Sequence, residues 1–144
     1  MTPTVTDLLN GCVLTLATPP RPEDAGVFAA ARIRLTALMN KLVALECAGG
    51  AAVRVWENAA LRALIAEAGP RHGVVPVDAA ETSDGDYSLG ALDAVNATLR
   101  RLLIRLHEAA ELACDTELER KVLKLYREIA QRRELHLPPV KPAT

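Results

Sequence analysis

Aromatic residues are scarce in this chain of 144 residues: it has one Phe, one Trp and two Tyr, although half of its residues are hydrophobic. A core must therefore be built from Leu, Val, Ile and Ala, and little aromatic surface is available for stacking on bases or planar cofactors. A chain of this length can bury about two-thirds of the surface that its unfolded form exposes, and one domain is the default. We expect a single helical domain over residues 1–144.

A large excess of charge of either sign is absent too. The chain has 17 basic and 18 acidic residues and a formal net charge of −1, whereas domains that bind nucleic acid are usually clearly basic. No hydrophobic run reaches the roughly 18 to 20 residues needed to span a bilayer, and residues 1–16 lack the positive leading region of a secretion signal. We expect a cytoplasmic protein with no membrane partner, and the balanced charge argues against a general nucleic-acid binder.

The motifs of common metal sites and catalytic sites are missing. His107-Glu108 begins a His-Glu-x-x-His zinc motif but no second His follows, and the Glu-x-x-His pairs of di-iron bundles and the glycine-rich phosphate loops do not occur. Cys12, Cys47 and Cys114 are odd in number and far apart, so we expect reduced thiols, mostly in the core. The sequence predicts no catalytic residue, no metal ligand and no cofactor.

The clearest positive signal is a long amphipathic stretch at residues 89–113. Its apolar residues step alternately by three and four, which keeps them on one side of an α-helix. They are Leu92, Val95, Leu99, Leu102, Leu106, Ala109 and Ala113. Arg101, Arg105 and Glu108 fall on the opposite side. Such a helix needs partner helices, from the same chain or from a second copy, to cover its apolar side.

Similar patterns predict helices before this stretch. Thr4 with Asp7 resembles a capping pair that starts a helix over residues 4–17, and a strand over residues 12–18 is the alternative. A second helix should begin after Pro22 and carries a stripe that again steps by three and four. The stripe consists of Phe28, Ala31, Leu35, Leu38, Leu42 and Leu45.

Two pairs of helix-breaking residues divide the middle of the chain. We expect Gly49-Gly50 to end the second helix near Ala48, with a kink as the alternative. A third helix should then run from Ala51 to Ala68 and end at Gly69-Pro70. A long loop at about residues 69–88 follows, in which Ser88 caps the next helix.

The apolar seam shifts phase after Ala113. We therefore expect a turn near residues 114–116, followed by a helix that starts with a capping box at Thr116 and Glu119 and ends near Glu134. One long helix with a phase slip is the rival interpretation. An extended C-terminal tail should occupy about residues 135–144. Together these elements predict an all-α fold, a small up-and-down bundle of four to five helices.

Three sets of side chains are candidates for binding. The run Trp56-Glu57-Asn58, followed by Arg62, places a carboxylate, an amide and a guanidinium near one side of a helix, and Trp56, Glu57 and Arg62 could line a ligand pocket there. Trp56 and Tyr126 could lie at the centre of a homodimer interface, because two helices have apolar faces that look wide for one small chain. An anion could contact a basic cluster formed by Arg100, Arg101 and Arg105.

These features support three hypotheses of function. The first is a non-enzymatic, self-associating protein-interaction module, a homodimer that could also bind another protein. The second is a small-molecule-binding helical bundle or a cryptic enzyme with a pocket near Trp56. The third is a DNA-associated helical domain that uses the arginine cluster, against which the balanced net charge counts.

Overall fold

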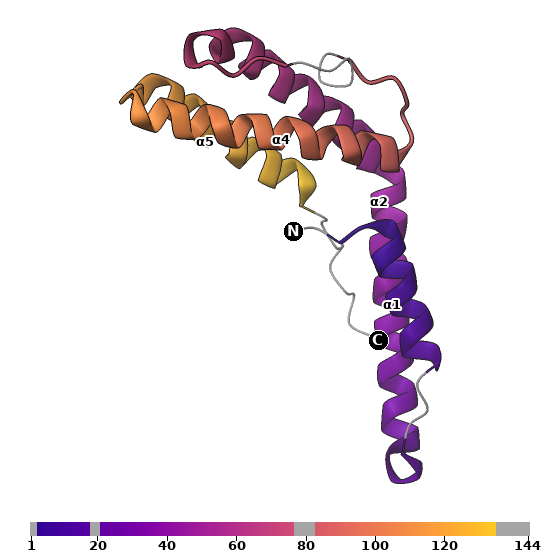
Figure 1. Cartoon of the computed structure of the whole chain (residues 1–144). Coiled ribbons are helices and arrows are strands. Elements are labelled where there is room, and N and C mark those ends of the chain that lie inside the picture. Colours follow the sequence, from indigo (N-terminus) through magenta and orange to yellow (C-terminus); the bar gives the residue numbers. More distant parts are fainter. Residues whose placement is uncertain (1–2, 18–20, 77–82, 135–144) are drawn as a thin grey trace, which may run out of the picture. The chain divides into compact units, whose positions relative to one another are not determined.

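The computed structural model of the chain describes residues 3–17, 21–76 and 83–134 (Figure 1). The elements in chain order are α1 (Val5–Ala17), the short 3-10 helix η1 (Pro22–Asp24), α2 (Ala25–Ala68), the 3-10 helix η2 (Gly69–His72), α4 (Leu89–Leu112) and α5 (Thr116–Arg133). The described residues contain no strand, so the predicted all-α fold is confirmed. In these ranges no helix combines the length and the apolar character required to cross a bilayer.

The chain divides into two units that each have their own internal contacts. One comprises residues 1–49 and 135–144, and the other residues 50–134. We call the described part of the first, residues 3–17 and 21–49, the hairpin unit, and the second the bundle unit. Such a division leaves the prediction of one domain open, because two units can still unfold as one. The predicted tail at 135–144 and residues 77–82 of the predicted loop lie outside the described residues.

Helix α2 corrects the prediction of two separate helices. The predicted end near Ala48 and the predicted start at Ala51 are wrong, because α2 continues through Gly49 and Gly50. Glycine accepts right-handed helical geometry as well as the left-handed geometry that ends a helix, and its cost relative to Ala is only about 1 kcal/mol. Neither glycine has a positive φ, and the Gly50 carbonyl accepts a hydrogen bond from Arg54 Nη1 at 3.0 Å.

The hairpin unit consists of α1 and the first part of α2. Thr4 and Asp7 form the predicted capping pair: Thr4 N donates to Asp7 Oδ2 at 2.9 Å, and Asp7 N donates to Thr4 Oγ1 at 3.1 Å. The two hydrophobic residues of this unit that are buried are Leu8 and Cys12. Cys47 and Cys114, by contrast, are exposed, so the prediction that most cysteines are core residues is wrong for these two.

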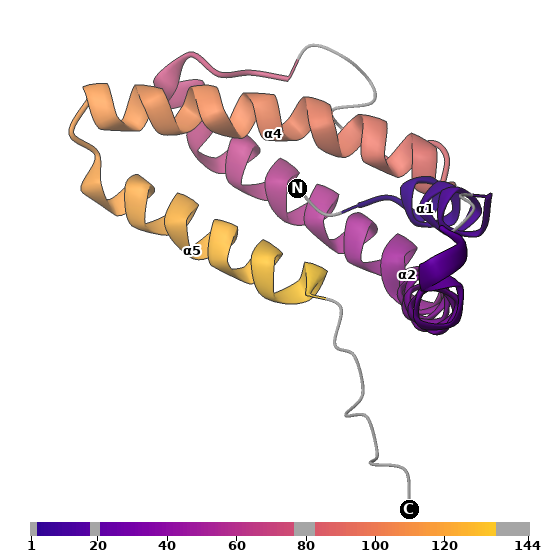
Figure 2. The same cartoon turned by 90° about the horizontal axis from the view of Figure 1, so that it is seen from below.

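The bundle unit consists of the second part of α2, α4 and α5, which run side by side (Figures 1 and 2). The predicted helix at 89–113 is confirmed as α4, and most of its predicted seam is buried. All three helices contribute to one apolar core: Leu61, Leu64, Ile65 and Ala68 from α2, Leu99, Leu102, Leu103, Leu106 and Ala110 from α4, and Leu118, Val122, Leu125 and Ile129 from α5.

The connections of the bundle unit depend on specific local geometry. The predicted turn after α4 is confirmed, and Cys114 adopts a φ of 53° in it. The cap of α5 is Asp115, whose carboxylate accepts from Leu118 N at 3.1 Å, so the prediction that Thr116 is the cap is wrong by one residue. Ser88 caps α4 as predicted. At Gly69 a Cβ atom would lie 2.0 Å from the Val74 carbonyl oxygen, so only glycine fits there.

Candidate functional site

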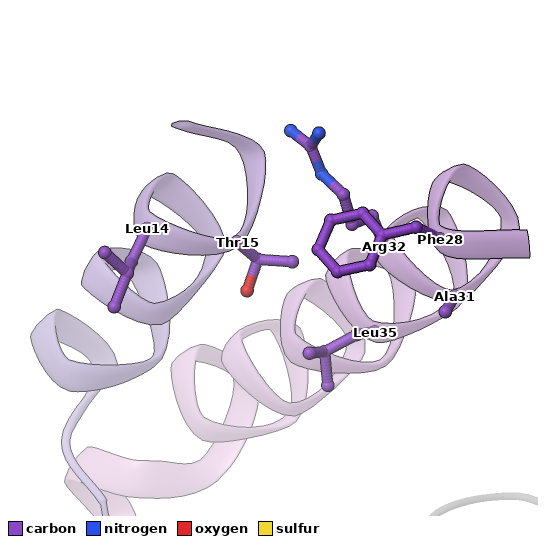
Figure 3. A pocket seen from close by; sticks show the side chains of 6 residues that line it. All are labelled: Leu14, Thr15, Phe28, Ala31, Arg32 and Leu35. Carbon is purple, nitrogen blue, oxygen red and sulfur yellow. The ribbon is translucent and has the colours of Figure 1, made fainter. Parts of the chain in front are cut away.

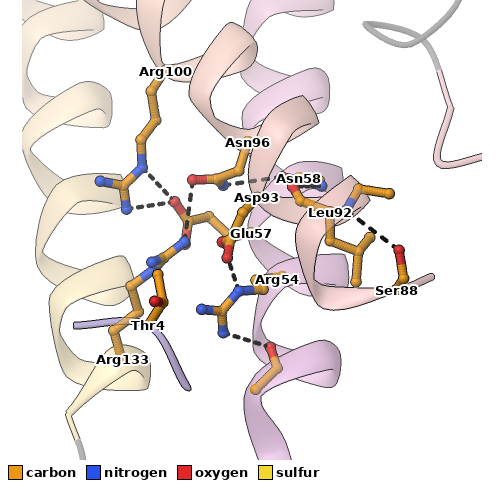
Figure 4. Close-up of polar contacts among 12 residues, drawn as sticks. Thr4, Arg54, Glu57, Asn58, Ser88, Leu92, Asp93, Asn96, Arg100 and Arg133 are labelled. Atoms are coloured by element: carbon orange, nitrogen blue, oxygen red, sulfur yellow. Dashed lines mark hydrogen bonds and ion pairs between the residues drawn. The ribbon is translucent and has the colours of Figure 1, made fainter. Parts of the chain in front are cut away.

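Glu57 of α2 lies at the centre of a polar network in the bundle unit (Figure 4). Its side chain has no exposed surface. Oε1 accepts from Arg100 of α4 at 2.7 Å, and Oε2 accepts from Arg133 of α5 at 2.6 Å. Because an ionised carboxylate is costly to bury alone, these two guanidinium groups are what makes a charge at this place tolerable.

Two asparagines extend the network across the helices. Arg133 Nη2 donates to Asn96 Oδ1 at 3.1 Å, and Asn96 Nδ2 donates to Asn58 Oδ1 at 2.9 Å. Asn58 Nδ2 in turn donates to the Leu92 carbonyl at 3.3 Å and to Asp84 Oδ1 at 3.1 Å. Both asparagines are buried, and each has hydrogen-bond partners on both sides of its amide, as buried amides require.

The outer end of the network is a second ion pair. Arg62 Nη2 lies 2.7 Å from Asp84 Oδ1, and this hydrogen bond lowers the pKa of Asp84. At Glu57, burial is the largest single influence and raises the pKa, but hydrogen bonds from Asn96, Arg133 and Arg100 together bring the pKa below its ordinary value. Both carboxylates are therefore ionised at neutral pH and make poor proton acceptors. The network joins three helices and the segment before α4, which is a structural role.

The predicted ligand residues Trp56, Glu57 and Arg62 have different partners in the structure. Glu57 binds Arg100 and Arg133, whereas Arg62 binds Asp84. Trp56 is half-buried against the core, and the guanidinium of Arg132 lies 4.1 Å from the centre of its ring. A ligand pocket at these residues stays a prediction. The charged groups of Glu57 and Arg62 form ion pairs with other residues of the chain.

Arg100, Arg101 and Arg105 have different surroundings in the structure. Arg100 turns toward Glu57, while Arg101 is exposed and donates to Thr98 Oγ1 at 2.9 Å. Arg105 is exposed on α4. Anion contact by the three residues stays a prediction. The guanidinium group of Arg100 is already paired with Glu57.

Tyr126, the other predicted interface residue, is partly buried in the bundle unit. Its ring meets that of His107 edge-on, with 6.1 Å between the ring centres. Burial raises the pKa of its hydroxyl. Trp56 and Tyr126 are thus partly covered by their own chain, which leaves less of each ring for a second copy.

Sequence reasoning missed three members of the network: Asp84, Asn96 and Arg133. One signal was available for Asn96, which falls four residues after Leu92 and three before Leu99 on the apolar side of α4. A polar residue at such a position needs a buried partner. Its partners come from other helices, so the spacing along one helix could not identify them.

The hairpin unit contains an apolar groove between α1 and α2 (Figure 3). It has a volume of about 320 Å³ and is lined by Leu14, Thr15, Phe28, Ala31, Arg32 and Leu35. The guanidinium of Arg32 lies 5.8 Å from the centre of the Phe28 ring and also donates to the Leu16 carbonyl. Half of the six lining residues belong to the stripe of apolar residues predicted for this helix.

A second hollow lies on the bundle unit between α2 and α5. It has a volume of about 310 Å³ and is lined by Ala60, Ala63, Leu64, Glu67, Lys121, Lys124, Leu125 and Glu128. Its charged rim is paired internally, since Lys121 lies 2.7 Å from Glu67 and Lys124 lies 3.8 Å from Glu128. The four charged side chains of this rim are therefore paired with each other.

Comparisons of the chain with protein-family models, with curated proteins and with solved structures found no match. Residues 3–17, 21–76 and 83–134 also contain no group of three or more side chains that could hold a metal ion. A functional assignment therefore rests on the side chains themselves.

Proposed function

We propose that the protein is a non-enzymatic protein-interaction module that associates with a second copy of itself through α2 of the hairpin unit. The observation that supports this proposal is a stripe of apolar residues on α2, which we call the heptad stripe. It consists of Phe28, Ala31, Leu35, Leu38, Leu42 and Leu45. Its steps of three and four are those of a coiled-coil seam. Each of its six residues is at least partly exposed, and Leu35 and Leu38 at its centre are 42% and 41% exposed.

The hairpin unit has more apolar surface than its two helices can cover. Its exposed large hydrophobic residues are Leu9, Val13, Leu14, Leu16, Val27, Ile33, Leu35 and Leu38. Stable domains consist of layers that bury each other's apolar faces, and a helix pair alone offers a single contact. Leu14 and Leu35 of this set line the same groove, and exposed apolar patches mark interaction sites.

A second copy of the chain is an occupant whose apolar spacing fits the stripe. A seam with heptad spacing is complementary to another helix of the same spacing, and a second α2 has that spacing by definition. Two-fold symmetric dimers that share one surface are by far the commonest homo-oligomers. Pairing two hairpins would give a four-helix arrangement with the two heptad stripes inside. The proposed dimer is centred on Leu35 and Leu38, whereas the sequence predicts Trp56 or Tyr126 near its centre.

Sedimentation velocity on the full chain tests the proposal. We expect a dimer at micromolar concentration for the unchanged chain and a monomer for the double variant L35Q/L38Q, which keeps good helix formers but removes the apolar centre. The matched control is I33Q, because Ile33 is 68% exposed on the same helix but lies outside the stripe. A monomeric unchanged chain, or equal dimerisation of both variants, would refute self-association through this surface.

A further inference from the structure

The charged residues along the heptad stripe from Ala25 to Leu45 are all basic, and Glu46, which follows the stripe, is acidic but buried. Between Ala25 and Leu45 the chain has no acidic residue, and its charged residues are Arg32, Arg34 and Lys41. Arg34 directly precedes Leu35, and Lys41 directly precedes Leu42. The two are seven residues apart and so flank the same edge of the stripe, two helical turns from each other. Both are exposed, and neither forms an ion pair with a described residue.

The other edge of the stripe is covered by α1. Met39, which follows Leu38, approaches Gly11 of α1 so closely that a Cβ there would lie 3.1 Å from Met39 Cε. Arg32 is on this edge as well, and its guanidinium is held by the Phe28 ring and the Leu16 carbonyl. A docking helix therefore meets α1 on one side and the free cations of Arg34 and Lys41 on the other.

This arrangement is electrostatically poor for a second copy. Adjacent helices of a bundle usually run antiparallel, and a two-fold antiparallel pair brings the same edge of both stripes together. Arg34 then faces Lys41 of the second copy, so two like-charged pairs flank the seam. Exposed like-charged pairs each cost a modest free energy, and salt screens them.

We propose that the heptad stripe is built for an acidic amphipathic helix of another protein, and that the homodimer is a resting state which such a helix displaces. The displacement rests on the proposed function, because it requires the homodimer. The acidic character of the partner helix is argued from the charges of Arg34 and Lys41 alone. The partner helix carries apolar residues at steps of three and four and Asp or Glu residues seven apart on the edge that faces Arg34 and Lys41. The regular spacing on α2 matches a helix, whereas a lipid surface requires no such spacing.

Two synthetic helical peptides test the partner chemistry on the full chain. Both have the same apolar heptad residues, and the positions that flank the seam are Glu in one and Lys in the other. By fluorescence anisotropy at low salt, we expect the Glu peptide to bind about tenfold more tightly than the Lys peptide, with the difference shrinking in high salt. The variant R34E/K41E should reverse the preference. The control R120E/R127E makes the same change of net charge at two exposed residues of α5 that are also seven apart, and it should leave the preference unchanged.

Displacement is measured by sedimentation of the full chain with excess Glu peptide, and we expect the dimer to be replaced by a one-to-one complex. Equal affinity for the two peptides, or the same loss of preference in R34E/K41E and R120E/R127E, would overturn the partner chemistry. A dimer that persists while the peptide stays free would overturn the displacement. Binding to vesicles of anionic lipid with no binding of the Glu peptide would overturn the choice of a helix. An unchanged chain that is monomeric yet prefers the Glu peptide would refute self-association but support the partner chemistry.

Discussion

The hairpin unit and the bundle unit differ in where they place their apolar residues. In the bundle unit, most large apolar residues of α2, α4 and α5 lie in one core, with the Glu57 network beside it. In the hairpin unit, Leu8 and Cys12 are the buried hydrophobic residues of the described part, and eight large hydrophobic residues are exposed. Under the proposed function this contrast is a division of labour, in which the bundle unit supplies stability and the hairpin unit supplies the surface for binding.

Removing the charge of Glu57 should destabilise the bundle unit more than any other change described below. In E57Q, Arg100 and Arg133 lose the carboxylate that neutralises them, and we expect the free energy of unfolding to fall by about 3–5 kcal/mol, the usual cost of breaking a buried ion pair from one side. Urea denaturation measures it. The control E67Q removes a carboxylate that is 56% exposed in its ion pair with Lys121, and its midpoint should match that of the unchanged chain. Equal midpoints for E57Q and E67Q would show that the network does not stabilise the bundle unit.

The same change of leucine to alanine should act differently in the two units. Leu103 has no exposed surface, so L103A should destabilise the chain by about 3 kcal/mol through lost burial and a cavity. Leu35 is 42% exposed, so L35A should change the stability of the monomer by less than about 1 kcal/mol. Thermal unfolding at a protein concentration below the dimer range compares the two. Similar losses would mean that the stripe is part of a core.

Gly69 should be sensitive to a single methyl group. A Cβ at this position would lie 2.0 Å from the Val74 carbonyl oxygen, and we expect G69A to lower the free energy of unfolding by about 2 kcal/mol, because backbone atoms must move. G90A is the control, since nothing lies within 4 Å of a Cβ at Gly90 on α4. Chemical denaturation should show G90A to be neutral or slightly stabilising. A neutral G69A would mean that the turn after α2 adapts freely.

Acid should weaken the bundle unit gradually. The pKa values of Glu57 and Asp84 are lowered in the folded chain, so these groups stabilise the fold above their unfolded pKa values of about 4 and lose this contribution as pH falls through the folded values. Urea midpoints at a series of pH values below neutral measure the loss. The difference between the unchanged chain and E57Q should shrink in acid, and a constant difference would contradict the role of the Glu57 charge.

The periodic features of the fold could be predicted from the sequence. The seam of α4, the Thr4 and Asp7 cap and the turn after Ala113 all depend on residues within a few positions of each other. Helix α2 could not be predicted in this way, because glycine at positions 49 and 50 permits both a helix end and a continuous helix. The cap at Asp115 depends on the backbone angles of its neighbour Cys114, which residue types alone do not specify.

The candidate site could be predicted only in part. Glu57 was identified, but its partners Arg100 and Arg133 come from two other helices, and Arg100 was placed in an anion cluster with Arg101 and Arg105. The heptad stripe was recognised as an apolar face, although its position outside the core required the structure. Spacing shows which residues share a side of a helix, whereas the partner of that side is a property of the three-dimensional arrangement.

Hydrogen exchange of the full chain at two protein concentrations tests the division of labour most directly. Between about 1 µM and about 100 µM, the account predicts slower amide exchange over residues 28–45 as the heptad stripe becomes covered, and unchanged exchange over α4 and α5. Exchange that does not depend on concentration, or slows first over α4 and α5, would contradict the claim that the hairpin unit is the binding surface.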